Sequence, residues 1–397
     1  QWVREGMPRS VLHRMVAGGL LALPARRERP GPTELARAHN EIGNVRSAKL
    51  DATRAYKSHC RALSVLESGE PGDRLPEEHR YELARTLYFL ANKHPGAPAD
   101  RRGDAAIERA ARPGPDLNSS AECRQAAIRI LDGLAAEYPD APDYRFLLAL
   151  CHRPSSSGPD PAGSPTGAEG RRRAIALLQQ LKAQYPGIVD YRYELTVTYA
   201  WIHVGLFPWQ EPSAFPSEAE QALLKALDES QWLVDHHPEI PHYAASQALV
   251  LAKLGTLSWR TRRFAEAEAF FQKALDTEST VIADFPDLPS HNRVVLEFFR
   301  LRLAQVQYDR IAGGQDLAGL GKSRDLLETC TENLSRLVPR PELTDDRLAW
   351  SALPVAYEAL SRVLDAIGDN QKAEEAKGSG NKIRRQSPDG RRYPWPQ

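Results

Sequence analysis

One segment of the sequence has residue types that could hold a nucleotide phosphate. Residues 319–323 read Gly-Leu-Gly-Lys-Ser and resemble the end of a phosphate-binding loop, in which backbone amides and a lysine hold phosphate oxygens. That loop also requires a glycine five residues before Gly321, where this chain has Asp316. It requires a strand in front of it as well, whereas residues 306–310 have a helical pattern. The segment therefore does not predict a nucleotide site, and we expect no cofactor.

The middle of the sequence holds a group of histidines that could be drawn as a metal site: His203, His236, His237 and His242. His236 and His237 are adjacent and would point about 100° apart on a helix. No H-E-x-x-H or His/Cys spacing completes a ligand set. We therefore predict no metal, although a metal-dependent enzyme or metal-binding site in the middle repeats, residues 95–243, stays open as an alternative.

The sequence lacks the motifs of the common catalytic centres. Its cysteines stand far apart without a C-x-x-C pair, which excludes a zinc knuckle or dithiol motif built from sequence neighbours: Cys60, Cys123, Cys151 and Cys330. There is no G-x-S-x-G elbow, and the glycine-rich loop, H-R-D and D-F-G motifs of a protein kinase are missing. We predict a non-catalytic chain, and a catalytic domain, if the protein has one, would precede Gln1.

Charge and hydropathy exclude further classes. The 397 residues contain 52 Lys+Arg and 52 Asp+Glu, so the chain lacks the basic surplus that is typical of nucleic-acid binders. The longest weakly polar stretch, residues 15–24, is too short to span a bilayer. The apolar run within residues 7–25 resembles a secretory signal only faintly, because Gly18 and Gly19 interrupt it. We expect a cytoplasmic protein that binds no nucleic acid and has no membrane span, and its oligomeric state stays open.

A proline-marked junction recurs along the chain. Its prolines stand at positions 139, 186, 238, 286 and 339, which are 47, 52, 48 and 53 residues apart. Proline cannot continue a helix and disfavours helical angles in the residue before it, so each junction ends one helix. An apolar residue lies four positions before each pre-proline residue, which is the spacing of one helix face: Leu134, Leu181, Leu233, Val281 and Leu334. The sequence therefore predicts a helical repeat with a period of roughly 50 residues.

Two of the repeats also carry the same set of positions at fixed spacings: an apolar residue, three small residues and a ring-bearing residue. In the clearest repeat these positions are Leu254, Gly255, Ala267, Phe271 and Ala274. In the first repeat the corresponding positions are Ile42, Gly43, Ala55, His59 and Ala62. Small residues at this spacing let two antiparallel helices approach closely, and the aromatic residue fills the gap between helix pairs. The pattern resembles the tetratricopeptide repeat (TPR) family, and the proline junctions look like the repeat regions of planctomycete-type signalling proteins such as TPR-bearing serine/threonine kinases.

We predict an all-α fold, a right-handed α-α superhelix or TPR-like solenoid of about seven helix pairs. The first helices are expected near residues 33–48, 77–94, 141–152, 189–206, 240–259, 289–311 and 345–367. Their partners are expected near residues 51–68, 119–138, 168–185, 217–237, 264–285, 320–338 and 371–384. Two S-x-x-E capping boxes mark starts of second helices: Ser119 with Glu122, and Ser217 with Glu220.

The predicted domain organisation is one repeat domain between two terminal segments. A partly disordered extension covers residues 1–32, the repeat domain residues 33–385, and a flexible tail residues 386–397. Pro/Gly/Ser-rich insertions are expected near residues 95–118, 153–167 and 207–216, because such a composition cannot form a core.

The TPR resemblance implies that the protein binds another protein or a peptide in a concave groove lined by the first helices. Asn44 and Asn92 hold the place of an asparagine that, in peptide-clamping members, bonds the ligand backbone, a task that suits an amide because it can donate and accept. The lysine one turn earlier in carboxylate-clamp members is replaced by Asn40 and Tyr88, which argues against capture of a peptide C-terminus. The predicted partner-binding residues are Arg37, Asn40, Asn44, Arg85, Tyr88, Asn92, Thr256, Trp259, Arg300 and Tyr308.

The function predicted from these features is that of a non-catalytic protein–protein interaction module. The module would be the scaffold or regulatory region of a bacterial signalling protein and would bind a peptide or partner helix. A structural spacer that follows a missing kinase or other catalytic domain stays open as the first alternative, and the metal site described above as the second.

Overall fold

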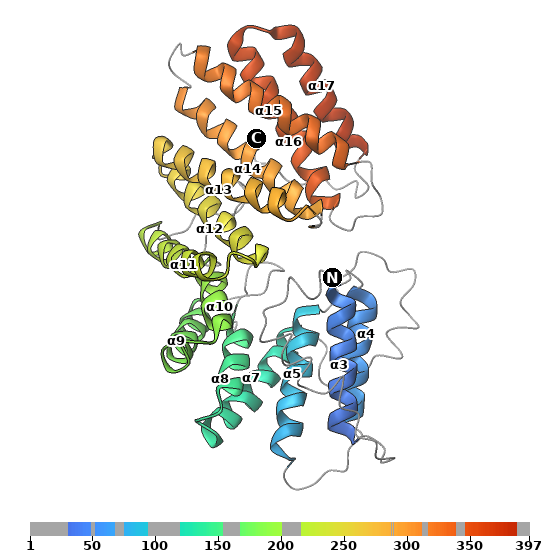
Figure 1. Ribbon diagram of the computed structural model, residues 1–397. Helices are drawn as coiled ribbons and strands as arrows, with labels where there is room; N and C mark the ends of the chain where they lie inside the picture. Colours follow the sequence, from blue (N-terminus) through green and yellow to red (C-terminus); the bar gives the residue numbers. More distant parts are fainter. Residues whose placement is uncertain are drawn as a thin grey trace. The chain divides into compact units, whose positions relative to one another are not determined.

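The predicted all-α class is confirmed. The computed structural model describes residues 31–48, 52–67, 75–93, 120–153, 167–200, 216–286, 288, 290–311, 317–338 and 346–386, and within these ranges every regular element is an α-helix. The helices number fourteen in this described part, as about seven predicted pairs require (Figure 1). The predicted extension, insertions and tail fall almost entirely outside the described ranges and stay predictions.

Each predicted helix is present, with ends within a few residues of the expected ones. The first helices are α3 (Pro32–Ala48), α5 (Glu77–Lys93), α8 (Pro142–His152), α10 (Val189–Ala200), α12 (Pro241–Arg260), α14 (Ser290–Ile311) and α16 (Asp346–Ile367). The helices predicted as their partners are α4 (Ala52–Glu67), α7 (Ser120–Glu137), α9 (Ala168–Gln184), α11 (Pro216–His236), α13 (Phe264–Asp284), α15 (Leu317–Leu337) and α17 (Asn370–Gln386). The predicted end of α10, residues 201–206, lies outside the described ranges.

Two details of the helix starts differ from the sequence prediction. Helix α11 begins at Pro216, so Ser217 lies inside its first turn rather than at the cap, and the capping box predicted there is wrong. Ser119, of the other predicted box, lies outside the described residues. Proline is favoured at a first helical position, because it has no N–H to leave unpaired there and its φ is already helical. The carboxylate of Glu220 instead accepts a hydrogen bond from Arg263 at 2.7 Å. Helix α15 begins three residues before the predicted start at 320, and it contains the Gly-Leu-Gly-Lys-Ser segment, so that segment is helical and forms no phosphate loop.

The chain divides into two compact units, residues 1–198 and residues 199–397. In the first unit α3 packs on α4, α5 on α7 and α8 on α9, and in the second α12 packs on α13, α14 on α15 and α16 on α17. Each of these pairs also packs on the next pair of its unit. Contacts between sequence neighbours are what a helical repeat requires, because each pair buries its apolar side only against adjacent pairs. The single repeat domain over residues 33–385 stays a prediction.

The proline junctions share one hydrogen-bonded turn. The backbone N–H of the pre-proline residue donates to the carbonyl four residues earlier at 2.8–3.0 Å, as in Tyr138 to Leu134 and Tyr185 to Leu181. The accepting residues are the apolar positions found in the sequence, and all are buried: Leu134, Leu181, Leu233, Val281 and Leu334. One carbonyl of the last helical turn is thus satisfied, while the side chain of the same residue enters the core and anchors the end of the helix.

Close approach of paired helices occurs where the small residues predicted it. A Cβ added at Gly255 would lie 2.9 Å from the ring of Phe271, and one added at Gly43 would lie 2.6 Å from Nε2 of His59. His59 therefore fills, in the first pair, the place that Phe271 fills in the second unit. The flanking alanines are fully buried in both cases: Ala55, Ala62, Ala267 and Ala274.

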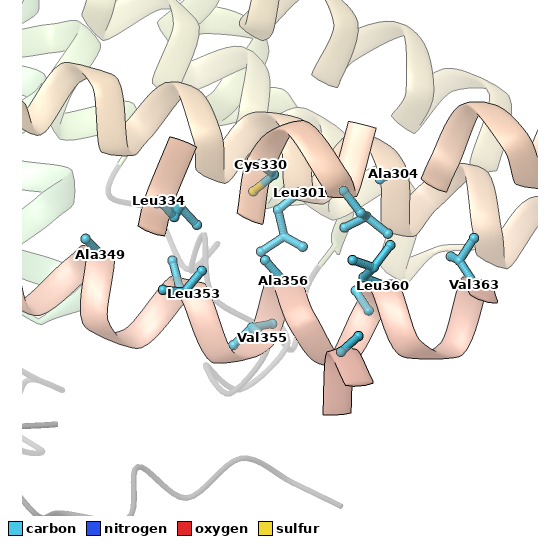
Figure 2. Close-up of a cluster of buried hydrophobic side chains, with 14 of the residues drawn as sticks. Leu301, Ala304, Cys330, Leu334, Ala349, Leu353, Val355, Ala356, Leu360 and Val363 are labelled. Carbon is cyan, nitrogen blue, oxygen red and sulfur yellow. The ribbon is translucent and has the colours of Figure 1, made fainter. Parts of the chain in front are cut away.

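The largest core described in the second unit lies between α14, α15 and α16. The apolar side of α16, including Leu353 and Leu360, faces Leu301 of α14 and Leu334 of α15 (Figure 2). The last helix, α17, closes this unit with a small apolar stripe of Ala373, Ala376 and Gly380. Its exposed positions are Asn, Gln, Lys, Glu, Arg or Gly, which is the polar outer side that a terminal helix of a repeat array needs.

Candidate protein-binding surface

The buried side chain of Asn40 joins the first three described helices, α3, α4 and α5. Its side chain donates to Glu82 Oε1 and to Thr86 Oγ1, both at 2.7 Å, and its carbonyl oxygen accepts from Nδ1 of His59 at 2.9 Å. Asn40 is fully buried, so the sequence prediction that it contacts a partner is wrong. The physical reason is that all these bonds are made within the protein, where an amide can donate and accept at once.

Charged side chains also link α3 to α5, next to these buried bonds of Asn40. The carboxylate of Glu82 is 1% exposed and lies 3.7 Å from Arg37 and 3.4 Å from Arg85. Arg85 also pairs with Glu41 and lies over the ring of Phe89, 5.4 Å from its centroid. Burial alone would lower the pKa of Arg85, but the two carboxylates outweigh it and the pKa lies above its usual value. The guanidinium is therefore a fixed, partly exposed cation.

A second set of polar contacts extends the surface to α8 and α10. Arg153, the residue that follows α8, pairs with Glu194 of α10 and is hydrogen-bonded to Tyr88 of α5. Burial raises the pKa of Glu194, and Arg153 opposes that rise. On the same side, Asn92 donates to the carbonyl of Tyr88 at 2.9 Å and accepts from Arg124 at 3.0 Å. Side-chain contacts thus connect α3, α5, α8 and α10, the first helices of the predicted pairs in this unit.

We call these residues the first-helix face of the first unit; they are Arg37, Glu41, Arg85, Tyr88, Arg153 and Glu194. Their charged side chains are 15–39% exposed, so they are held in place and still reach solvent. Three of them, Arg37, Arg85 and Tyr88, were predicted from the sequence. The sequence prediction missed Glu41, Arg153 and Glu194. Glu41 lies 44 residues from its partner Arg85, and Arg153 lies 41 residues from Glu194, so no local spacing pointed to them.

The remaining predicted residues of the first unit lie nearby. Asn44 is half-buried on α3, one turn after Asn40. Asn92 is exposed, but the bonds described above already hold its side-chain amide.

In the second unit the predicted partner-binding residues do not lie together on one surface. Trp259 donates to Asp309 at 2.8 Å and so links α12 to α14, and its ring lies 5.6 Å from the guanidinium of Arg302. Thr256 is 2% exposed and bonds the carbonyl of Ala252, so the prediction that it contacts a partner is wrong. Its β-branched side chain satisfies the helix carbonyl from inside the core.

Arg300 and Tyr308 do not join Trp259. Arg300 pairs with Glu297, whose other oxygen accepts from Asn333 of α15 at 2.9 Å. Arg300 and Arg302 are two residues apart and point about 200° apart on the helix. Arg300 thus faces the second helices while Arg302 lies toward Trp259, and Tyr308 is half-buried against the core around α16.

Of the histidines considered as metal ligands, His203 lies outside the described residues, and His236 and His237 have other contacts. His236 stacks on Trp232 at 4.0 Å and bonds its carbonyl, and His237 lies 3.7 Å from Glu239. Among the residues that the structure describes, no group of three His, Cys, Asp or Glu side chains is arranged to hold a metal ion. The described helices also include none that is long and apolar enough to cross a membrane.

Comparison with known proteins gives no family. No protein-family model matches the chain, and no curated protein matches it. Among solved structures the chain is similar to the assembly chaperone of RpL4 (Acl4), with 15% identity over 86% of this chain and 99% of that one, at a TM-score of 0.41. It is also similar to apo RapI, with 10% identity over 88% and 98% and a TM-score of 0.38, and to the nuclear import adaptor Nro1 of S. pombe, with 11% over 88% and 94% and a TM-score of 0.29. Such values say nothing about a partner or an activity.

Proposed function

We propose that this protein is a non-catalytic interaction module that binds a peptide or a partner helix on the first-helix face of its first unit. The observation that supports the proposal is the connection of α3, α5, α8 and α10 by side chains that are fixed but partly exposed. Side chains already held in one geometry lose little further freedom on binding, so they make good recognition groups.

The charge of this face favours a partner of mixed polarity. Arg37, Arg85 and Arg153 are matched by Glu41, Glu194 and the underlying Glu82, so the face has no net charge. Recognition would rest on hydrogen bonds and on the aromatic side chain of Tyr88, and its affinity would depend only weakly on salt.

The finer proposal follows the sequence resemblance. We propose a TPR-type repeat that serves as a scaffold or regulatory region of a bacterial signalling protein in the cytoplasm. The buried small residues around Gly43 and Gly255 support a TPR-type pair, because they occupy the positions at which that repeat needs close helix contact.

A comparison of matched variants tests the binding proposal. The full chain is used as bait in a lysate of the source organism, together with Arg85→Ala, Tyr88→Ala and the control Arg172→Ala. Arg172 lies in the same unit, pairs with Glu169, and is 70% exposed away from this face. We expect a saturable partner that is retained by Arg172→Ala and lost by the other two variants. Equal retention by all variants, or the absence of a saturable partner, would favour the structural-spacer alternative.

A further inference from the structure

The two terminal helices of the described chain differ in the chemistry of their outer sides. Helix α17 is polar on its outer side, as described above. Helix α3 instead exposes Leu35 (38%), Ala38 and Ile42 (43%). These residues are spaced three and four apart and form one stripe about two turns long. The stripe lies on the side of α3 opposite the buried residues Ala36, Asn40 and Gly43.

A terminal repeat normally hides such a stripe under a polar cap, because an exposed apolar side invites association. Of the large apolar side chains that are exposed in the described part of the chain, Leu35 and Ile42 are the two that share one helix side. The other two, Tyr138 and Leu224, lie singly on separate elements.

Basic groups lie along the α4 side of this stripe, whereas the exposed Glu34 lies on its other side. Arg46 lies four residues beyond Ile42 and reaches across to α4, where it donates to Ser58 Oγ at 2.7 Å. Arg61 of α4 is exposed. Burial lowers the pKa of His39, and the nearby Arg61 and Arg46 lower it further. Within the described ranges no carboxylate lies within ion-pair distance of Arg46 or Arg61.

The charge decides between three possible occupants of the stripe. The N-terminal residues 1–30 contain six Arg and two Glu, so they would bring like charge to Arg46 and Arg61. A second copy docked through antiparallel α3 helices would also place this basic side against itself. A helix with apolar residues on one side and carboxylates beside them would match both the stripe and its flank.

We propose that the outer side of α3, formed by Leu35, Ala38 and Ile42 and flanked by Arg46 and Arg61, binds an acidic amphipathic helix of a partner protein. Such a helix would lie along α3 and present apolar side chains at i, i+3 or i+4, and i+7. This surface is separate from the first-helix face, so either binding proposal can fail without the other.

A designed peptide pair tests the proposal with the full chain. The probe is a labelled helical peptide of about 20 residues with Leu on one side and flanking Glu, and its counterpart carries Lys in place of Glu. Fluorescence anisotropy should show binding of the Glu peptide and at least about tenfold weaker binding of the Lys peptide. The double variant Leu35→Ser/Ile42→Ser, and separately Arg61→Glu, should each lose at least about tenfold in affinity for the Glu peptide.

Leu224→Ser is the matched control, because Leu224 is 44% exposed on α11 of the other unit. It should bind the Glu peptide as the unchanged chain does, and circular dichroism should show unchanged helix content in all variants. Equal binding of the two peptides, or no effect of the α3 variants, would overturn the proposal.

A photo-crosslinker at position 42 distinguishes the occupants. Cross-links to the Glu peptide support the proposal. Cross-links to residues 1–30 of the same chain, or a covalent dimer through α3 that persists in the presence of the peptide, would instead show that the chain itself covers the stripe.

Discussion

Replacement of Asn40 by alanine should destabilise the first unit more than any surface substitution in it. The side chain makes one bond to a buried carboxylate, one to a buried hydroxyl and one to a buried histidine. A hydrogen bond to a charged group contributes about 1.5–3 kcal/mol and one to a neutral group about 1 kcal/mol. Glu82 keeps Arg37 and Arg85 nearby, so part of the loss is compensated. We expect the free energy of local unfolding to fall by about 3 kcal/mol, which corresponds to an increase of about a hundredfold in the equilibrium constant for opening.

Hydrogen exchange followed by mass spectrometry is the suitable assay, because the two units need not unfold together. Amides of α3, α4 and α5 should exchange about a hundredfold faster in Asn40→Ala, while those of α12 to α17 should keep their rates. Asn92→Ala is the control, since Asn92 is an exposed asparagine with two hydrogen bonds in the same unit. A loss under about 1 kcal/mol for Asn40→Ala, or one equal to that of the control, would refute the assignment of a buried three-helix bridge.

Two further predictions concern packing and protonation. Gly255→Ala should lower the free energy of unfolding by about 1–3 kcal/mol because its Cβ would collide with Phe271, whereas Gly133→Ala, where the Cβ meets open space, should raise it by about 0.5–1 kcal/mol in chemical denaturation. The opposite order would contradict the close-approach argument. Burial lowers the pKa of Lys253, whose ammonium donates to the carbonyl of Ala200, from 10.5 to about 8. Between these values the unfolded chain holds the proton that the folded chain has lost, so stability should rise with pH from about 8 to 10.5. Thermal unfolding of Lys253→Met should lack this rise, and an equal rise in both proteins would exclude Lys253 as its source.

The helices and their junctions could be predicted from the sequence because the signal for them is local. A proline ends a helix wherever it stands, and an apolar residue four positions before the junction reports which side is buried. Leu134 and Leu334 show both roles in one residue, and neither needs a distant partner to be recognised.

The side-chain network could not be predicted in this way. Asn40 bonds residues 42 and 46 positions away, and in the sequence it looks the same as the exposed Asn92. Arg153 was assigned to an insertion, although it pairs with Glu194 of the next repeat. The direction of Arg300 depends on the exact register of α14, and the repeat pattern was too weak there to fix it. Burial of polar groups depends on which helices meet, and that is decided by packing rather than by spacing.

The bridge of Asn40 and His59 also bears on how faithfully this chain assembles. Repeat proteins misfold by docking similar helices in the wrong order or one turn out of place. A one-turn shift of α3 that puts Ala36 in the place of Asn40 moves its side chains by about 5.4 Å. It would break the bonds of Asn40 and leave Glu82 buried beside an apolar neighbour. The second-unit pair has Phe271 at the place of His59 and so cannot offer the same acceptors and donors. The bonds of Asn40 therefore favour one neighbouring helix over the others, much as a single buried asparagine selects the alignment of a coiled coil.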